Sequence, residues 1–268
     1  MPLRLAVVGD PIAHSRSPAI HTAALSALEL HGSYEARRTR GPEMEEVIAQ
    51  LRKGALSGVN VTMPLKGVAA ALVDSLSPQA RRAGSVNTIV RRPDGGLEGH
   101  NTDISALQRL WPVDISTPTL VLGAGGAAAA ACLAARGRTL YVSARRPGAV
   151  SALADGLGME IAEAPWGAAV VDAVIVNATP LGMQSESLPN RVVALSSGLM
   201  DLAYGPAPTP AVVEARRLGI PTVDGIEFLV AQAADSFRLW TGREPPLAAM
   251  TEAALNHSSR VGQAPNDI

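Results

Sequence analysis

Lys66 and Asp103 are the residues of the sequence best placed to move a proton. Lys66 falls in the first turn of an expected helix, where the positive end of the helix dipole disfavours a cation. The same field makes a lysine ammonium a better proton donor, although a surface lysine is the alternative. Asp103 opens another expected helix and would by itself serve as its cap. Together the two side chains would form an acid–base pair at the junction of two domains, where a cleft is expected.

A glycine-rich turn predicts a dinucleotide site. The segment Gly123-Ala124-Gly125-Gly126-Ala127-Ala128 fits the pattern G-x-G-x-x-A between an expected strand and an expected helix. Gly123 would permit the tight turn, Gly125 would let the backbone approach a pyrophosphate, and Ala128 would let helix and strand pack closely. The helix N-terminus would face the anion. The alternative is a glycine turn that only precedes an alanine-rich helix.

The end of the next expected strand favours a cofactor that carries a 2′-phosphate. An NAD site would place an Asp or Glu about 20 residues after the glycines. The segment Tyr141-Val142-Ser143-Ala144-Arg145-Arg146-Pro147 contains no acid. Arg145 and Arg146 offer planar guanidinium groups that suit a phosphate, so the sequence predicts NADP rather than NAD. Two exposed loop arginines are the alternative, but the missing acid argues against NAD in either case.

Further polar side chains gather where expected strands begin or end, the edge at which open α/β sheets collect ligands. Ser15 and Ser17 lie two residues apart in a loop and would offer two neutral donors to a carboxylate near a helix N-terminus. In the alternative interpretation, Ser17 only caps the helix and Ser15 is a loop residue. Thr62 ends one strand and Asn87 enters another. These residues are candidates for binding a small polar molecule.

Strands alternate with helices along most of the chain. Strands are expected at 3–9, 34–37, 58–62, 86–91, 97–99, 119–122, 139–143, 171–177, 198–202 and 221–224, and helices at 19–30, 42–53, 64–76, 103–110, 125–136, 149–157, 210–218, 226–241 and 247–258. A turn at 93–96 suits a β-hairpin, and 112–118 suits a crossover between domains. This alternation predicts an α/β fold with parallel sheets and right-handed crossovers.

Composition narrows the functional classes. The 268 residues include 47% hydrophobic and 18% charged residues, which excludes a disordered or collagen-like chain and allows two domains. The formal charge is −1, and three Trp, three Tyr and two Phe offer little base stacking. We therefore expect no nucleic-acid partner and no membrane partner, and the absence of a long apolar run predicts a soluble, cytoplasmic protein.

Metal and disulfide chemistry are not expected. The single cysteine, Cys132, cannot form an intramolecular disulfide and lies in an alanine-rich run typical of a buried thiol. The five histidines are dispersed at 14, 21, 31, 100 and 257, and none is paired at a metal-ligand spacing. The sequence therefore predicts no metal site.

The motifs taken together resemble the shikimate dehydrogenase family over nearly the full chain. The matching stretches are Gly9-Asp10-Pro11-Ile12-Ala13-His14-Ser15-Arg16-Ser17-Pro18-Ala19-Ile20-His21, Asn60-Val61-Thr62-Met63-Pro64-Leu65-Lys66, Val86-Asn87-Thr88, Asn101-Thr102-Asp103, Gly123 to Ala127, Asn177-Ala178-Thr179-Pro180-Leu181-Gly182-Met183, Asp201-Leu202-Ala203-Tyr204 with Thr209-Pro210, and Gln232-Ala233-Ala234 with Phe237 to Gly242. The resemblance implies an NADP-dependent oxidoreductase that reversibly reduces 3-dehydroshikimate to shikimate with NADPH, a step of aromatic amino-acid and chorismate biosynthesis. It also implies a substrate domain at 1–102 and 225–268, a Rossmann-type NADP domain at 103–224, and a monomer or homodimer.

The resemblance also assigns roles to individual residues. Lys66 and Asp103 would be the catalytic pair. The substrate carboxylate would be bound by Ser15, Ser17 and Tyr204, and the ring hydroxyls by Thr62, Asn87 and Gln232. The cofactor would be held by Gly123, Ala124, Gly125, Gly126, Ala127, Ala128, Arg145, Arg146, Asn177, Thr179, Gly225 and Phe228.

Several positions depart from the family pattern. Asp10 stands where Asn is usual, Ala144 replaces an Asn, and Ile104 and Ala106 replace glycines. Glu227 replaces a glycine beside the expected nicotinamide site, where an acid would weaken cofactor binding or alter its geometry. Two other functions remain open: a quinate/shikimate dehydrogenase, and a non-catalytic NADP-binding sensor of the same fold.

Overall fold

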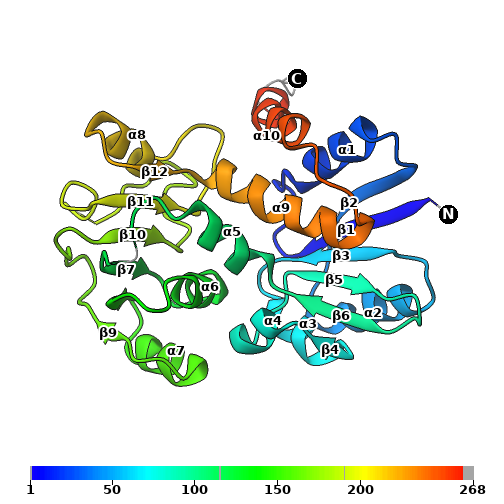
Figure 1. Cartoon of the computed structure of the whole chain (residues 1–268), viewed down its shortest axis with the longest axis horizontal. Coiled ribbons are helices and arrows are strands. Elements are labelled where there is room, and N and C mark those ends of the chain that lie inside the picture. The colour runs from blue at the N-terminus through cyan, green and yellow to red at the C-terminus, as the bar shows by residue number, and fades with distance from the viewer. Residues whose placement is uncertain (1, 115, 190, 262–268) are drawn as a thin grey trace, which may run out of the picture. The chain divides into compact units, whose positions relative to one another are not determined.

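The computed structural model describes residues 2–114, 116–189 and 191–261 (Figure 1). The chain divides into two compact units. The first comprises Met1–Thr102 and Val230–Ile268, and the second comprises Asp103–Leu229. The second boundary falls at residue 230, inside a helix, whereas the sequence interpretation placed it at residue 225.

The first unit contains a mixed six-stranded sheet in the order β2-β1-β3-β5-β6-β4. Its strands are β1 (Leu3–Gly9), β2 (Gly32–Arg38), β3 (Gly58–Val61), β4 (Ser75–Leu76), β5 (Thr88–Arg91) and β6 (Leu97–His100). The expected hairpin at 93–96 is confirmed, because β5 pairs antiparallel with β6. Since β5 also runs antiparallel to β3, the expectation of parallel sheets alone is wrong for this unit.

Helices cover this sheet and mostly confirm the sequence pattern. They are α1 (Ser17–Ala27), a 3₁₀ turn (Gly41–Glu43), α2 (Met44–Arg52), α3 (Lys66–Leu72), α4 (Pro78–Ala83), most of α9 (Gly225–Thr241), and α10 (Leu247–Val261). The helix expected at 64–76 is shorter, because its last residues form β4. Helix α4 was not predicted, although the Ser77 hydroxyl caps it by accepting from the Ala80 N–H at 3.2 Å.

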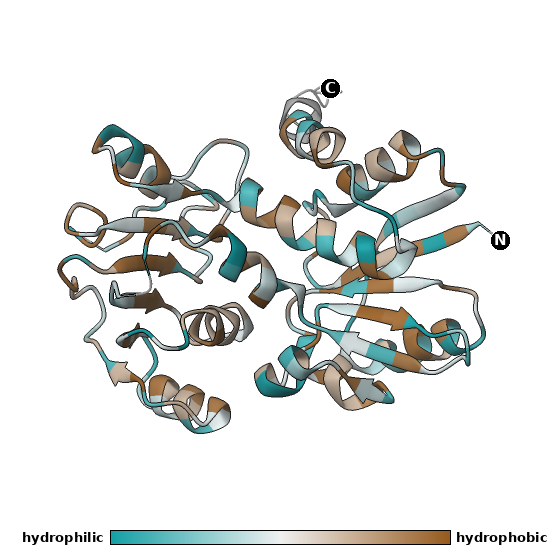
Figure 2. Cartoon of the chain, in the orientation of Figure 1, coloured by the Kyte–Doolittle hydropathy of each residue, from teal (hydrophilic) through white to brown (hydrophobic). Residues whose placement is uncertain are grey.

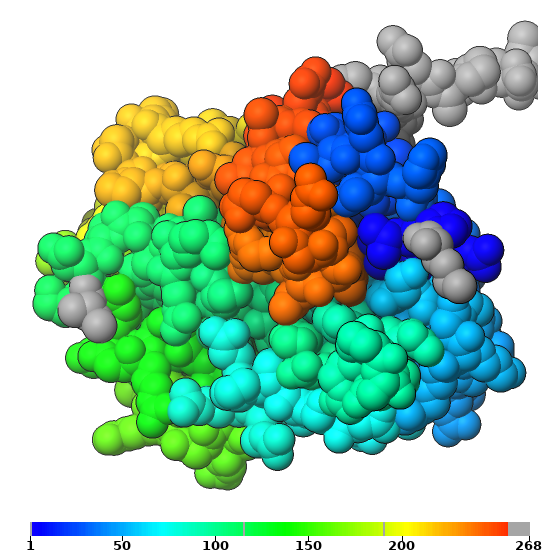
Figure 3. Space-filling model, turned by 45° about the vertical axis from the view of Figure 1, so that its right-hand side comes forward, coloured from blue at the N-terminus to red at the C-terminus, as the bar shows by residue number. Residues whose placement is uncertain are grey.

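An aliphatic core holds the first unit together. Side chains of β1 and β3 pack on α2 and the hairpin, through Val8, Met44, Leu51, Val59 and Ile89, all buried. Helices α1 and α10 lie side by side (Figures 1 and 3), and the Arg16 guanidinium donates to the Ala254 carbonyl of α10 at 2.8 Å. This bond ties the loop before α1 to the carboxy-terminal helix.

The second unit contains a parallel six-stranded sheet in the order β12-β11-β10-β7-β8-β9. Its elements are α5 (Thr102–Leu110), β7 (Thr119–Leu122), α6 (Gly126–Ala134), β8 (Leu140–Ser143), α7 (Ala149–Leu157), β9 (Ala162–Glu163), β10 (Val174–Asn177), β11 (Gly198–Asp201), α8 (Pro210–Arg217), β12 (Thr222–Val223) and the start of α9. Counted within the unit, this order is 3-2-1-4-5-6, that of dinucleotide-binding sheets. The order therefore confirms the Rossmann-type prediction.

Two details of this unit differ from the sequence interpretation. Strand β10 begins at Val174 rather than residue 171, because Val171 is exposed and Asp172 has a positive φ of 58°. The two-residue strand β9 was not predicted, and both of its residues are exposed. Figure 2 shows apolar residues along β7 and β10. Leu120 and Leu122 of β7 and Ile175 of β10 belong to the buried core of this unit. Among the described residues, no helix is long and apolar enough to cross a bilayer.

Candidate functional site

The glycine turn of the second unit requires glycine at its first position. Gly123 follows β7 directly and has φ +110°, a conformation that L side chains rarely adopt. A Cβ there would also lie 3.0 Å from the carbonyl oxygen of Ala178, in the turn that follows β10. The two turns therefore lie against each other at the point where strand order reverses between β7 and β10, the place where such sheets bind ligands.

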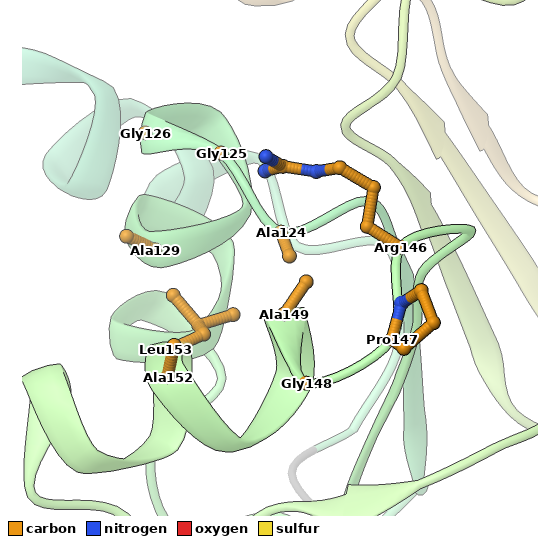
Figure 4. A pocket seen from close by; sticks show the side chains of 10 residues that line it. All are labelled: Ala124, Gly125, Gly126, Ala129, Arg146, Pro147, Gly148, Ala149, Ala152 and Leu153. Atoms are coloured by element: carbon orange, nitrogen blue, oxygen red, sulfur yellow. The ribbon is translucent and has the colours of Figure 1, made fainter.

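A pocket of about 550 Å³ opens beside this turn (Figure 4). It is lined by Ala124, Gly125, Gly126, Ala129, Arg146, Pro147, Gly148, Ala149, Ala152 and Leu153. Gly125 precedes α6 without a side-chain cap, and a Cβ at this position would meet no atom within 4 Å. The bare backbone at a helix N-terminus suits an anion, as the sequence predicts for Gly125.

The two arginines after β8 have different surroundings. Arg146 lines the pocket, and its side chain extends toward Gly125 in Figure 4. The guanidinium of Arg145 lies 5.9 Å from the ring centroid of Trp166, within cation–π range. Neither Ser143 nor Ala144 supplies an acid that would repel a phosphate. The residues that line the pocket thus offer a helix N-terminus and a guanidinium, with no carboxylate among them, and this combination fits a phosphorylated dinucleotide.

Asn177 and Thr179 follow β10. Asn177 has no exposed surface, and its amide is used inside the unit: Nδ2 donates to the Leu181 carbonyl at 3.0 Å, and Oδ1 accepts from the Thr179 hydroxyl at 2.6 Å. Thr179 is partly exposed. Of the two, Thr179 is the one that offers surface to a ligand, whereas Asn177 shapes the turn.

Glu227, which departs from the family pattern beside the expected nicotinamide site, forms a capping box. Asp224 Oδ1 accepts from the backbone N–H groups of Ile226 and Glu227, each at 3.0 Å, and Glu227 Oε2 accepts from the Asp224 N–H at 2.8 Å. The exposed carboxylate of Glu227 thus turns back onto the helix start. Its neighbours Gly225 and Phe228 are buried and partly buried, respectively.

In the first unit, Thr62 and Asn87 lie at one edge of the sheet. Strands β1 and β3 end there, and β5 begins there because it runs antiparallel to β3. The backbone N–H of Thr62 donates to the Val8 carbonyl at 2.9 Å, and that of Val61 donates to the Asn87 carbonyl at 2.8 Å. Thr62 and Asn87 are therefore held at neighbouring strand ends.

Ser15 and Ser17 lie where β1 leads into α1. Arg16, not Ser17, occupies the capping position, so the interpretation of Ser17 as an N-cap is wrong. Ser17 is the first residue of the helix, and its N–H donates to the Ser15 hydroxyl at 3.3 Å. The Ser15 hydroxyl thus lies against the backbone of Ser17 at a helix N-terminus, an arrangement suited to a carboxylate.

Lys66 lies in the first turn of a helix, as predicted; it is the first residue of α3, which begins two residues later than expected, and it is partly exposed. Its carbonyl accepts from the Val86 N–H at 3.0 Å, next to Asn87 in the chain. Asp103 is 5% exposed and lies in the first turn of α5. Because α5 already begins at Thr102, the interpretation of Asp103 as an N-cap is wrong. Asp103 and the partly exposed Tyr204 belong to the second unit, whereas Gln232 belongs to the first.

A buried polar cluster behind this edge was missed by the sequence interpretation. Asn60 Nδ2 lies within hydrogen-bond distance of the Asn87 carbonyl (3.1 Å), the Thr88 hydroxyl (3.1 Å) and the Ser236 hydroxyl (3.0 Å). Asn60 Oδ1 accepts from the Tyr34 hydroxyl at 2.6 Å. The signal was a polar residue inside an apolar strand, Gly58-Val59-Asn60-Val61, which predicts a satisfied buried amide.

His21 packs beside this cluster. Its ring is fully buried and stacks on Tyr34 at a centroid distance of 4.3 Å. Burial lowers the pKa of His21 to about 3, so the ring is neutral at physiological pH. Throughout the described part of the chain, no group of three or more His, Cys, Asp or Glu side chains could hold a metal ion.

Cys132 lies on the buried face of α6, as the sequence predicts. Burial raises the pKa of its thiol to about 12. Such a thiol is not poised for nucleophilic chemistry, which requires the thiolate.

The strand order, the glycine turn and the basic pocket define the class of the chain: an α/β protein with a Rossmann-type dinucleotide-binding unit. The sequence profile of the shikimate dehydrogenase substrate binding domain matches residues 7–89, and that of the shikimate 5′-dehydrogenase C-terminal domain matches residues 225–255. The chain belongs to the shikimate dehydrogenase family.

Full-length relatives agree with this assignment. The shikimate dehydrogenase (NADP(+)) of Thermus thermophilus is 40% identical and aligns over 94% of this chain and 97% of its own length. That of Methylobacterium radiotolerans is also 40% identical, over 90% and 92% of the two chains. A crystal structure of shikimate 5-dehydrogenase from Thermus thermophilus, in complex with NADP(H) and shikimate, has a TM-score of 0.85 at 39% identity and covers 95% of this chain and 99% of the other.

Proposed function

We propose that the chain catalyses the reversible NADPH-dependent reduction of 3-dehydroshikimate to shikimate. The observation that carries this proposal is the presence of both halves of such a site in one chain of this family. One is a sheet edge rich in hydroxyl and amide groups beside Lys66, and the other is a glycine-turn pocket lined by Arg146. Full-length relatives at 40% identity support the same reaction.

The cofactor-binding roles follow from the shape of the second unit. The backbone from Gly123 to Ala128 holds the pyrophosphate at the start of α6, which has no side-chain cap and where a Cβ at Gly125 would meet no atom within 4 Å. Arg146, with Arg145, binds the 2′-phosphate. Thr179, Gly225 and Phe228 lie along the nicotinamide half, with Asn177 behind them.

The substrate-binding roles follow from the chemistry at the sheet edge. Ser15 and Ser17 at the start of α1, with Tyr204, bind the carboxylate through neutral hydroxyl donors. Thr62, Asn87 and Gln232 bind the ring hydroxyls, since amide and hydroxyl groups can both donate and accept. All proposed ligands come from one chain, so the site is compatible with a monomer or a homodimer.

Lys66 and Asp103 form the proposed acid–base pair. The nicotinamide supplies the hydride of this reaction. As negative charge develops on the substrate carbonyl oxygen, the Lys66 ammonium stabilises that charge and donates the proton, and Asp103 orients the ammonium. The resemblance to the family supports this pairing. Within the first unit, the Lys66 carbonyl accepts from the Val86 N–H, and the side chain of the next residue, Asn87, is hydrogen-bonded to Thr102.

The deciding experiment is a nicotinamide absorbance assay with shikimate or quinate and NADP or NAD, in all four combinations. We expect turnover with shikimate and NADP to exceed turnover in each of the other three combinations. Comparable turnover with quinate and NAD would favour a quinate/shikimate dehydrogenase. NADP binding without turnover of either substrate would favour a non-catalytic sensor.

We further propose that the enzyme acts in the cytoplasm. The one cysteine of the chain is a free, buried thiol, which is compatible with a reducing compartment. Fractionation of cells that express the chain, with activity followed in each fraction, tests this location.

A further inference from the structure

A buried carboxylate in the second unit, Asp201, has no assigned role in binding substrate or cofactor. It is the last residue of β11 and has no exposed surface. Burial raises its pKa, whereas the hydrogen bonds it accepts oppose this effect. Burial of a carboxyl group costs folding free energy unless its oxygens accept hydrogen bonds, so the hydrogen-bond partners of Asp201 indicate its structural role.

Asp201 accepts hydrogen bonds from three separate places. Oδ1 accepts from the Asn177 amide at 2.7 Å and from the Ala203 N–H at 3.1 Å, and Oδ2 accepts from the Thr209 hydroxyl. Asn177 ends the neighbouring strand β10 and is the register partner of Asp201. Thr209 caps α8 by accepting from the Val212 N–H at 3.3 Å. One carboxylate thus joins a strand end, the chain after β11, and a helix start.

Through Asn177, the carboxylate fixes the turn that faces the glycine loop. Asn177 Oδ1 accepts from the Thr179 N–H at 3.1 Å, and the Thr179 hydroxyl accepts from the Leu181 N–H at 3.2 Å. The Ala178 carbonyl of this turn lies 3.0 Å from the position that a Cβ of Gly123 would take. Any rotation of the Asn177 amide would therefore disturb the surface against which the cofactor turn packs.

Through the Ala203 N–H, the same carboxylate sets the chain just before Tyr204. The Leu202 N–H donates to the Asn177 carbonyl at 3.1 Å, so this segment is also tied to β10. The Ala203 carbonyl lies only 2.2 Å from the position that a Cβ of Gly225 would take, which makes it the surface on which α9 begins. Tyr204 and Gly225 are thereby placed by a backbone that Asp201 holds.

We propose that Asp201 is a positioning residue that fixes the cofactor-side turn at 177–182 and the Tyr204 segment in one arrangement. The inference rests on the proposed function, since it assigns a purpose to the residues that this network holds. Asp201 acts through Asn177 and Ala203 and does not touch substrate or cofactor.

The test compares Asp201→Ala with Asp201→Asn, using the full chain. In Asp201→Ala, we expect the Kd for NADPH, measured by fluorescence titration, and the KM for shikimate each to rise at least tenfold. In Asp201→Asn, the Kd for NADPH and the KM for shikimate should each stay within about threefold of the wild-type value. The amide oxygen of the new side chain still accepts from Asn177 and Ala203, while its NH₂ group donates to the Thr209 hydroxyl. Thr119→Val is the matched control, because Thr119 is buried in the same sheet and its hydroxyl is unpartnered.

A merely structural role would lower Tm without changing the Kd or the KM of the folded fraction, and that result would overturn the proposal. So would an Asp201→Asn variant as impaired as Asp201→Ala. If Asp201→Ala fails to fold, Thr209→Val, which removes one of the three donors, should shift both constants in the same direction by about threefold, and unchanged constants would overturn the proposal. A wild-type chain that binds NADPH but does not oxidise shikimate would contradict the proposed function alone, since the NADPH titration still tests Asp201.

Discussion

The side chain of Asn87 and the first residue of α5, Thr102, exchange hydrogen bonds in both directions. Asn87 Nδ2 donates to the Thr102 hydroxyl at 3.0 Å, and the Thr102 N–H donates to Asn87 Oδ1 at 2.8 Å. Asn87 is thus both a proposed substrate ligand and the anchor of the helix that carries Asp103. The carbonyl of Lys66 is bound to the residue just before Asn87. In the proposed mechanism, substrate binding and proton transfer therefore depend on the same short stretch of chain.

Replacement of Lys66 by alanine should lower kcat strongly and change the KM for shikimate little. The variant lacks the proposed proton donor of the transition state but keeps the hydroxyl and amide groups proposed to bind the substrate, so kcat should fall by about 10²–10⁴-fold. Steady-state kinetics of shikimate oxidation measure both constants. Unchanged turnover would remove Lys66 from the mechanism.

Replacement of Arg146 by alanine should weaken NADP binding more than replacement of Arg145. Arg146 lines the pocket, whereas Arg145 lies over Trp166. A hydrogen bond to a charged group contributes about 1.5–3 kcal/mol, so the KM for NADP should rise by at least about tenfold in Arg146→Ala while the KM for NAD stays nearly constant. Equal effects of the two variants would contradict the assignment of Arg146 as the main phosphate contact.

Replacement of Asn60 by leucine should destabilise the chain. The variant removes the hydrogen bonds that Asn60 makes with the Tyr34 hydroxyl and the Asn87 carbonyl, and each lost hydrogen bond costs about 0.5–1.5 kcal/mol. Urea unfolding followed by circular dichroism gives the change in the free energy of unfolding. Thr119→Val serves as the control, because it removes a buried hydroxyl that has no hydrogen-bond partner. A change such as Val59→Leu would not serve, because it overpacks the core.

Replacement of Glu227 by alanine should leave kcat unchanged and lower stability by only about 1 kcal/mol. Its carboxylate accepts the Asp224 N–H in a capping box and is exposed. Thermal unfolding and NADP kinetics on the same preparation separate the two effects. A large gain in NADP affinity in the variant would show instead that the acid repels the cofactor.

Stability should fall in mild acid because of His21. Burial lowers the folded pKa of His21 to about 3, below the usual value of 6.5. Between these two values the unfolded chain binds more protons than the folded one, so the free energy of unfolding decreases as pH falls from about 6.5 toward 3. His21→Phe should flatten this part of the profile in urea titrations at several pH values. Retention of the acid-dependent loss of stability in His21→Phe would contradict this prediction.

The sequence predicted the dinucleotide unit closely because its signals are local. Gly123 must adopt a positive φ, and the strand before it and the helix after it are continuous apolar segments. The roles of Asn60 and Asp201 could not be predicted in this way, because their partners come from distant parts of the chain, such as Ser236 for Asn60 and Thr209 for Asp201. The capping contact of Glu227 could not be predicted either, since it depends on the backbone conformation around Asp224.

The reactivity of the Cys132 thiol can measure local opening of the second unit. Because the side chain is fully covered and its pKa is about 12, a thiol reagent reacts only after α6 has opened away from the sheet. The labelling rate therefore measures how often α6 opens, and the first turn of this helix is the proposed pyrophosphate site. A ligand that slows the labelling of Cys132 at concentrations near its Kd would do so by making the opening of α6 rarer.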